Sequence, residues 1–124
     1  MKIAATIARI ILGLAFVVFG LNCFLNFIPQ PPPPPGLAGD YVKVFVASHY
    51  IYVVGAMQLL SGLLLLIGRF VALGLTILAA ILFNIWAFHL LMAPEGVGPA
   101  VIATVLWLLV FWQHRDRFAG VLAR

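Results

Sequence analysis

The sequence predicts an all-α protein, a bundle of four membrane-spanning helices with a short interfacial helix after a polyproline loop. Hydrophobic residues make up 65% of the 124 residues and charged residues only 8%, whereas an ordinary soluble domain is about a quarter charged. Between Val44 and Pro94 the only formally charged residue is Arg69. That stretch is too long for one span of roughly 20 residues and suits two. Proline and glycine clusters divide the remaining apolar sequence into separate segments.

The chain is expected to form a single membrane domain. Spans are predicted at about residues 4–28, 49–67, 70–92 and 97–113, and the last of these is short for a bilayer. The first span is interpreted as a retained helix, because its apolar run from Ile10 to Phe27 exceeds the usual core of a signal peptide. Arg9, near its start, is expected to extend its charged head to the interface. The second and third spans form a hairpin that turns at Gly68 and Arg69.

The loop after the first span is rich in proline. Because proline fixes φ and lacks the backbone donor, the first helix must end at the run from Pro29 to Gly36. That run is predicted to be a stiff polyproline II spacer. From Leu37 to Ser48, apolar residues share one face while Asp40 and Lys43 lie off it. This pattern predicts a short helix in the membrane interface, which could continue into the second span.

The distribution of basic residues predicts the orientation of the bundle. An even number of spans places both termini on one side of the membrane, together with the turn between the second and third spans. That side holds Lys2, Arg9, Arg69, Arg115, Arg117 and Arg124, and the opposite side holds Lys43, Asp40 and Glu95. The positive-inside rule therefore places both termini in the cytoplasm, and we expect the inner (plasma) membrane of a bacterium.

Two pairs of glycines predict close helix packing. Gly13 and Gly20 are seven residues apart in the first span, and Gly55 and Gly62 are seven apart in the second. Each pair lies on one helix face, two turns apart, where small residues let helix backbones approach. We therefore interpret these glycines as packing positions, since no phosphate-binding glycine motif accompanies them.

Polar residues within the spans are the default candidates for a site, because a lipid environment makes them costly. They are Asn22, Asn26, His49, Gln58, Ser61, Asn84, His89 and Thr104. At roughly 1.5 Å per residue, most of them fall in the outer half of the predicted bundle. Gln58 and Asn84 lie at similar depth near the middle of the membrane, each beside small residues, and could bond to each other across the hairpin.

Two interpretations of these residues remain open. In one, each amide bonds a neighbouring helix and the histidines sit at the interface. In the other, they line an outward-facing pocket for a quinone headgroup or similar amphipathic ligand, with aromatic rings to stack on it. The candidate ligand-binding residues are Asn22, His49, Gln58, Asn84, Trp86, His89 and Trp107. Haem held by His49 and His89, or transport, is a weaker alternative.

The sequence excludes several classes of chemistry. Cys23 is the only cysteine, so a CxxC redox motif and covalent c-type haem are ruled out. No catalytic motif and no metal-binding motif is present. The net charge of +4 comes from basic residues spread over the span ends, which indicates membrane topology rather than nucleic-acid binding.

Five features of the chain occur together in order: RIILGLAFVVFGLN (9–22), the proline loop, GLLLLIGRF (62–70), NIWAFH (84–89) and RDRF (115–118). In these features the chain resembles the DoxX-like family of small integral membrane proteins. The resemblance implies a four-helix membrane protein. Some relatives are described as the small membrane subunit of thiosulfate:quinone oxidoreductase, and others as partners of secreted or membrane redox proteins.

Two positions depart from the family pattern. Relatives often carry a Lys where this chain has Cys23, and a Glu near the position of Gln58. If either charge is functional in relatives, its loss here argues against a shared activity and is compatible with a partner or scaffold role.

The favoured expectation is an accessory membrane subunit of a redox or quinone-linked system, with a redox protein as its partner and quinone as its possible cofactor. The alternative is a non-enzymatic scaffold or assembly factor, and a small-molecule transporter is less favoured. Self-association is compatible with so small a bundle, and no residue specifies the number of copies.

Overall fold

The computed structural model describes residues 2–121 and 123, and all regular elements among them are helical. The elements are α1 (Lys2–Leu25), α2 (Leu37–Ala47), α3 (Tyr50–Ile67), α4 (Val71–Leu91), η1 (Pro94–Gly96), α5 (Gly98–Gln113) and η2 (Arg115–Phe118). The all-helical prediction is confirmed. Helices α1, α3 and α4 are long and apolar enough to cross a membrane, whereas α5 is apolar but has only 16 residues. Arg124, which entered the charge count, lies outside the described residues.

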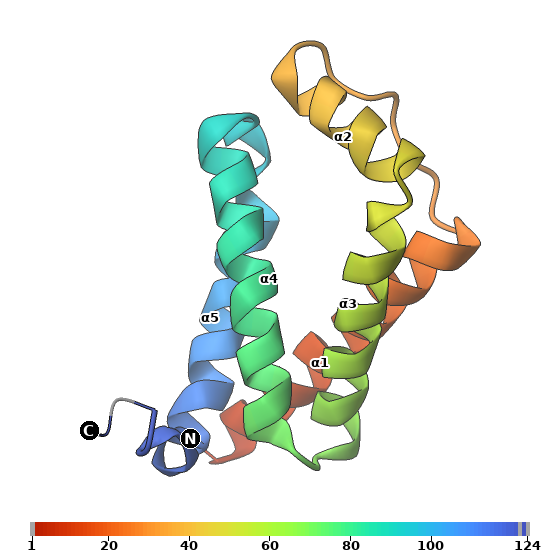
Figure 1. The fold of residues 1–124 in the computed structure, drawn as a ribbon. Coiled ribbons are helices and arrows are strands. Elements are labelled where there is room, and N and C mark those ends of the chain that lie inside the picture. The colour runs from red at the N-terminus through yellow and green to blue at the C-terminus, as the bar shows by residue number, and fades with distance from the viewer. Residues whose placement is uncertain (1, 122, 124) are drawn as a thin grey trace.

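The four long helices form two antiparallel pairs, α1 with α3 and α4 with α5. The pairs converge at the end that holds the start of α1, the α3–α4 turn and η2, and they diverge toward α2 and η1 (Figure 1). The hydrophobic core lies at the converging end. Its members are Ala8, Leu12, Phe16, Leu65, Val71, Leu75, Leu78, Ile81, Leu82 and Val110. The diverging end therefore has less side-chain packing between the pairs.

Glycines bring the backbones of α1 and α3 together. A Cβ added at Gly62 would lie 2.8 Å from the carbonyl oxygen of Gly13, and one at Gly20 would lie 2.9 Å from that of Gly55. Neither gap leaves room for a methyl group. The two glycine pairs predicted from the sequence thus face each other across one interface, and the packing interpretation is confirmed.

Arg9 fastens the converging end of this pair. Its guanidinium group donates to the carbonyl oxygen of Leu65 and, at 3.4 Å, to that of Leu66. These carbonyls belong to the last turn of α3, where the helix has no backbone donors left and its dipole favours a cation. Gly68 ends α3 with a left-handed φ of 72°, and a Cβ there would lie 3.1 Å from the guanidinium. The sequence predicted only an interfacial charge at Arg9, because the partner carbonyls are 56 residues away.

Helix α1 ends before the proline run rather than at it. Asn26 takes a left-handed φ of 50° and donates its N–H to the carbonyl oxygen of Asn22 at 3.0 Å. Asparagine tolerates this conformation and commonly ends a helix. The side-chain oxygen of Asn22 then accepts the N–H of Ile28 at 2.9 Å. The two asparagines therefore terminate the helix, and Pro29 only prevents it from restarting.

The predicted short helix after the proline run is present as α2. Gly39 of α2 packs so closely against the carbonyl group of Pro34 that a Cβ would overlap it. The end of the proline run therefore lies directly against α2. The suggested continuation into α3 is wrong, because His49 takes a left-handed φ of 66° and breaks the helix between α2 and α3.

Candidate functional site

A cleft with two arms lies between the helix pairs. One cavity of about 530 Å³ lies between α1 and the α4–α5 pair, and one of about 340 Å³ lies among α2, α3 and α4. Gln58, Ile85 and His89 line both cavities, so the cavities adjoin. We call the larger cavity, with Leu12 and Leu106 in its wall, the apolar arm, and the smaller, with Tyr41 in its wall, the polar arm.

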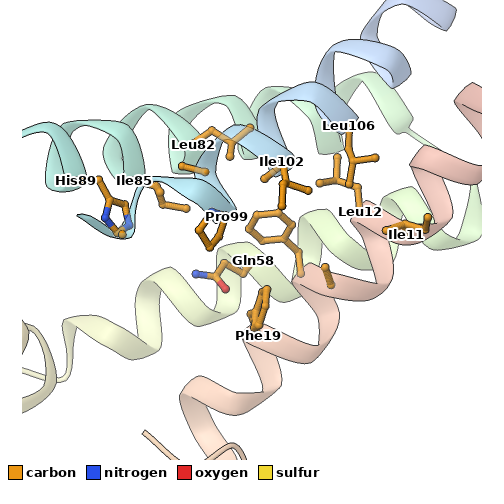
Figure 2. Close-up of a pocket in the computed structure, with 15 residues that line it drawn as sticks. Ile11, Leu12, Phe19, Gln58, Leu82, Ile85, His89, Pro99, Ile102 and Leu106 are labelled. Atoms are coloured by element: carbon orange, nitrogen blue, oxygen red, sulfur yellow. The ribbon is translucent and has the colours of Figure 1, made fainter. Parts of the chain in front are cut away.

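Gln58 stands at the junction of the two arms. It is half-buried on α3, and Figure 2 shows its amide in the space between α3 and the α4–α5 pair, with Pro99 beyond it. Among the described residues, no side-chain hydrogen bond of Gln58 is formed, while its backbone carbonyl accepts the hydroxyl of Ser61 at 3.0 Å. The amide is thus available to a molecule in either arm.

Asn84 lines the polar arm opposite α3. Its side-chain nitrogen donates to the carbonyl oxygen of Ala80, one turn back on its own helix, at 2.9 Å. The suggested hydrogen bond from Asn84 to Gln58 across the hairpin is not formed, because this amide satisfies a donor locally. Asn84 is exposed, and among the described residues its side-chain oxygen and second N–H form no hydrogen bond.

His89 lines both arms near the end of α4. Its Nδ1 lies 3.1 Å from the carbonyl oxygen of Ala93. Since a carbonyl can only accept, Nδ1 must donate, and in the neutral ring Nε2 is then an acceptor. A Cβ at Gly96 would lie 2.9 Å from Cε1 of the ring, so glycine at this position makes room for the histidine. The sequence left the direction of this ring open.

Asn22 and His49 lie outside the cleft. Asn22 terminates α1, as described above. His49 is exposed at the break between α2 and α3, where its ring stacks on Tyr52 with the ring centroids 5.5 Å apart. The structure therefore does not bring His49 and His89 together in one cavity, as haem ligation would require.

Trp86 and Trp107 also lie outside the cleft and join α4 to α5. The indole N–H of Trp86 donates to the hydroxyl of Thr104 at 2.8 Å, and that hydroxyl donates to the carbonyl oxygen of Ala100 at 2.7 Å. The indole N–H of Trp107 donates to the carbonyl oxygen of Leu75 at 2.9 Å. Of the seven candidate residues, the cleft thus contains Gln58, Asn84 and His89.

Two aromatic side chains of α2, Tyr41 and Phe45, form a roof over the polar arm that was not predicted from the sequence. The ring centroids of Tyr41 and Phe88 are 5.1 Å apart, which connects α2 to α4. Phe45 bridges Tyr41 and Tyr50, at 5.7 and 5.8 Å. The sequence feature that could have indicated this roof is the spacing of Tyr41 and Phe45 by one helical turn, which places both rings on one face of α2.

The cleft is uncharged. Among the described residues, no Asp, Glu, Lys or Arg lines either arm, and no group of three His, Cys, Asp or Glu side chains could hold a metal ion. The arrangement can therefore donate and accept hydrogen bonds and stack rings. It offers no carboxylate for proton transfer.

Comparison with known proteins identifies the family. The model of the family described as DoxX matches residues 4–91, which include α1 apart from its first two residues, α2 to α4, and Gln58, Asn84 and His89 of the cleft. Searches of curated proteins and of solved structures found no match. Because the match spans well over half of the chain and the helices are apolar, this protein is a small integral membrane protein of the DoxX family.

Proposed function

We propose that this protein is a four-span accessory subunit of a redox or quinone-linked system in a bacterial inner membrane. In this proposal the cleft holds a quinone-like amphipathic ligand on the outer side, and both termini are cytoplasmic. The observation that carries the proposal is the meeting of Gln58, Asn84 and His89 in one uncharged cleft with otherwise apolar and aromatic surroundings. Such walls, with a few convergent polar groups, suit a small ligand.

The polar groups of the cleft match both redox states of a quinone. A quinone carbonyl requires a donor, which the amides of Gln58 and Asn84 can supply. A quinol hydroxyl requires an acceptor, which Nε2 of His89 and the side-chain oxygen of Asn84 can supply. Phe88 and Tyr41, with centroids 5.1 Å apart, offer ring faces and edges next to these groups.

The short helix α5 is proposed as the fourth span. Its 16 residues extend roughly 24 Å at 1.5 Å per residue, against a hydrocarbon core of about 30 Å. A shorter helix is accommodated by local thinning of the bilayer. Hydrogen bonds from Trp86 and Trp107 hold α5 along α4, which supports the same depth for both helices.

The chain itself is proposed to bind rather than to catalyse. Electrons would enter or leave the bound quinone through a separate redox protein, because the cleft walls contain only neutral hydrogen-bonding and apolar groups. The partner would dock at the diverging end, where the cleft lies under α2.

The proposal is tested by purifying the protein from native membranes in mild detergent and measuring its quinone content. We expect a near-stoichiometric quinone, seen as a redox difference spectrum and identified by mass spectrometry. Asn84→Leu should lose this quinone. Thr76→Val should keep it, because Thr76 also bonds one turn back, to Ala72 at 2.8 Å, but lines neither arm.

Two results would overturn the proposal. One is a quinone content no higher than that of an unrelated membrane protein prepared in parallel. The other is equal quinone content in the wild type and Asn84→Leu. A stoichiometric protein partner without quinone would favour the scaffold function instead, and the native mass of the same preparation would report self-association.

A further inference from the structure

We infer that the ligand is a neutral amphiphile with a single tail, and that it lies across the cleft with its ring in the polar arm and its tail in the apolar arm. This inference deepens the proposed function and rests on the same cleft. It assigns a separate task to each cavity, which the proposed function does not.

The two arms differ in the chemistry of their walls. Apart from the shared Gln58 and His89, the apolar arm is lined only by aliphatic, phenylalanine, proline and glycine residues among those described. The polar arm adds Asn84, Tyr41 and Tyr50 to the shared pair. A polar ring in the apolar arm could bond only Gln58 and His89 and would not reach Asn84, Tyr41 or Tyr50. A hydrocarbon chain in the polar arm would cover the amides of Gln58 and Asn84 without bonding them. Both arrangements cost free energy.

The direction of each arm agrees with this assignment. Along α5 the apolar arm extends from Pro99 to Leu106, roughly 10 Å at the helical rise, and it leads from the diverging end toward the core residue Leu12. The polar arm lies under the roof formed by Tyr41 and Phe45. A tail would thus extend toward the middle of the bilayer, and the ring would stay near the level of α2.

The cleft disfavours the commonest membrane amphiphiles. A phospholipid has two hydrocarbon chains, and only the apolar arm can hold a chain without covering polar side chains that would then lack hydrogen-bond partners. Its head also carries an anionic phosphate, for which neither arm offers a Lys or Arg side chain among the described residues. A neutral ring with one hydrocarbon tail meets both conditions.

The inference is tested by locating photoreactive groups after binding to the full chain in detergent. One probe is a decyl benzoquinone with a diazirine at the end of its tail, and a second carries an azide on its ring. Fragmentation of the intact labelled chain then identifies the modified residues. We expect the tail label on Leu12, Ile102 or Leu106, and the ring label on Met57 or Asn84.

A variant that narrows one arm, compared with a matched control on the same helix, tests the position of the tail. Ala103→Phe narrows the apolar arm and should reduce the tail label on α5 severalfold. Val105→Phe, at an exposed position of the same helix, should leave it unchanged. If Ala103→Phe does not fold, Ala15→Phe narrows the same arm from α1. Tail labelling of Val105 as strong as that of Leu106, or tail labelling of Asn84, would overturn the inference.

A third probe separates this inference from the proposed function. A decyl phenol with the same tail diazirine has a neutral ring but no quinone chemistry. If no quinone is retained from native membranes and the phenol probe still gives the expected label positions, the inference stands and the quinone function fails. If native quinone is retained but the label positions are reversed or scattered, the quinone function stands and the inference fails.

Discussion

The two helix pairs are held together in different ways. In the α1–α3 pair, glycines allow the backbones to touch, with Gly20 packed against Gly55 and Gly62 against Gly13. In the α4–α5 pair, larger side chains separate the backbones, and the indoles of Trp86 and Trp107 bond across the gap. Each pair is therefore held by a different kind of contact.

The cleft lies where these two modes of packing leave space. The pairs contact each other through α3 with α4 and α1 with α5, their hydrophobic core lies at the converging end, and the cleft lies nearer the diverging end. The polar residues between them, Gln58 and Asn84, form no hydrogen bond with each other and face the cleft instead. Polar residues inside a membrane bundle are therefore not always helix-packing contacts, and here they mark the surface that the packing leaves free.

The largest expected effect is on the glycine interface. Gly62→Ala would place a methyl group 2.7 Å from the backbone nitrogen of Val17 and 2.8 Å from the carbonyl oxygen of Gly13. We expect a loss of about 3 kcal/mol in the free energy of unfolding in detergent, measured by denaturant titration. Gly98→Ala is the control, because no atom lies within 4 Å of its Cβ position. Equal stability of the two variants would rule out backbone contact between α1 and α3.

The next effect concerns the same pair at its converging end. Arg9→Met removes the guanidinium that bonds the last carbonyls of α3. We expect a loss of about 2 kcal/mol, the usual value for a charged hydrogen bond. Lys2→Met, at an exposed residue of the same helix, should change stability little. A similar change in both variants would mean that Arg9 contributes only its interfacial charge.

A smaller effect is expected in the α4–α5 pair. Trp107→Phe keeps the ring stack on Phe111, whose centroid is 5.2 Å away, but removes the donor to Leu75. Interhelical hydrogen bonds in membranes contribute about 0.6–2 kcal/mol, so we expect a loss of about 1 kcal/mol. Trp112→Phe should be near neutral because Trp112 is 53% exposed. If both variants are neutral, the indole bond does not hold the pair.

The α1–α3 pair was largely predictable from the sequence, whereas the α4–α5 pair was not. Glycines seven residues apart on each of two helices indicate close helix packing in a membrane, so their role could be inferred from the sequence, and the structure then showed which glycines face each other. An indole donor has no such local signature, since the acceptor of Trp107 is 32 residues away. Trp86 and Trp107 were therefore expected to stack on a ligand, and they bond neighbouring helices instead.

The cleft was predicted only in part for a related reason. Depth and polarity, judged from the helical rise, selected Gln58, Asn84 and His89, which line the cleft. The same criteria selected Asn22 and His49, which do not. The direction in which each side chain points depends on competing acceptors close by. Asn84 donates to the carbonyl oxygen of Ala80, and His89 donates to that of Ala93. Neither hydrogen bond could be predicted from residue spacing alone. The break at His49, which positions the roof, likewise depends on a backbone conformation that histidine rarely adopts.

The most direct test of the account is a double-mutant cycle of unfolding free energies for Gln58→Leu and Asn84→Leu. If these amides face a cleft rather than each other, their effects on stability should add, with a coupling energy within about 0.3–0.5 kcal/mol of zero. A coupling energy of about 1 kcal/mol or more, the size of an interhelical hydrogen bond, would mean that the two amides hold the helices together, and the central claim would be wrong.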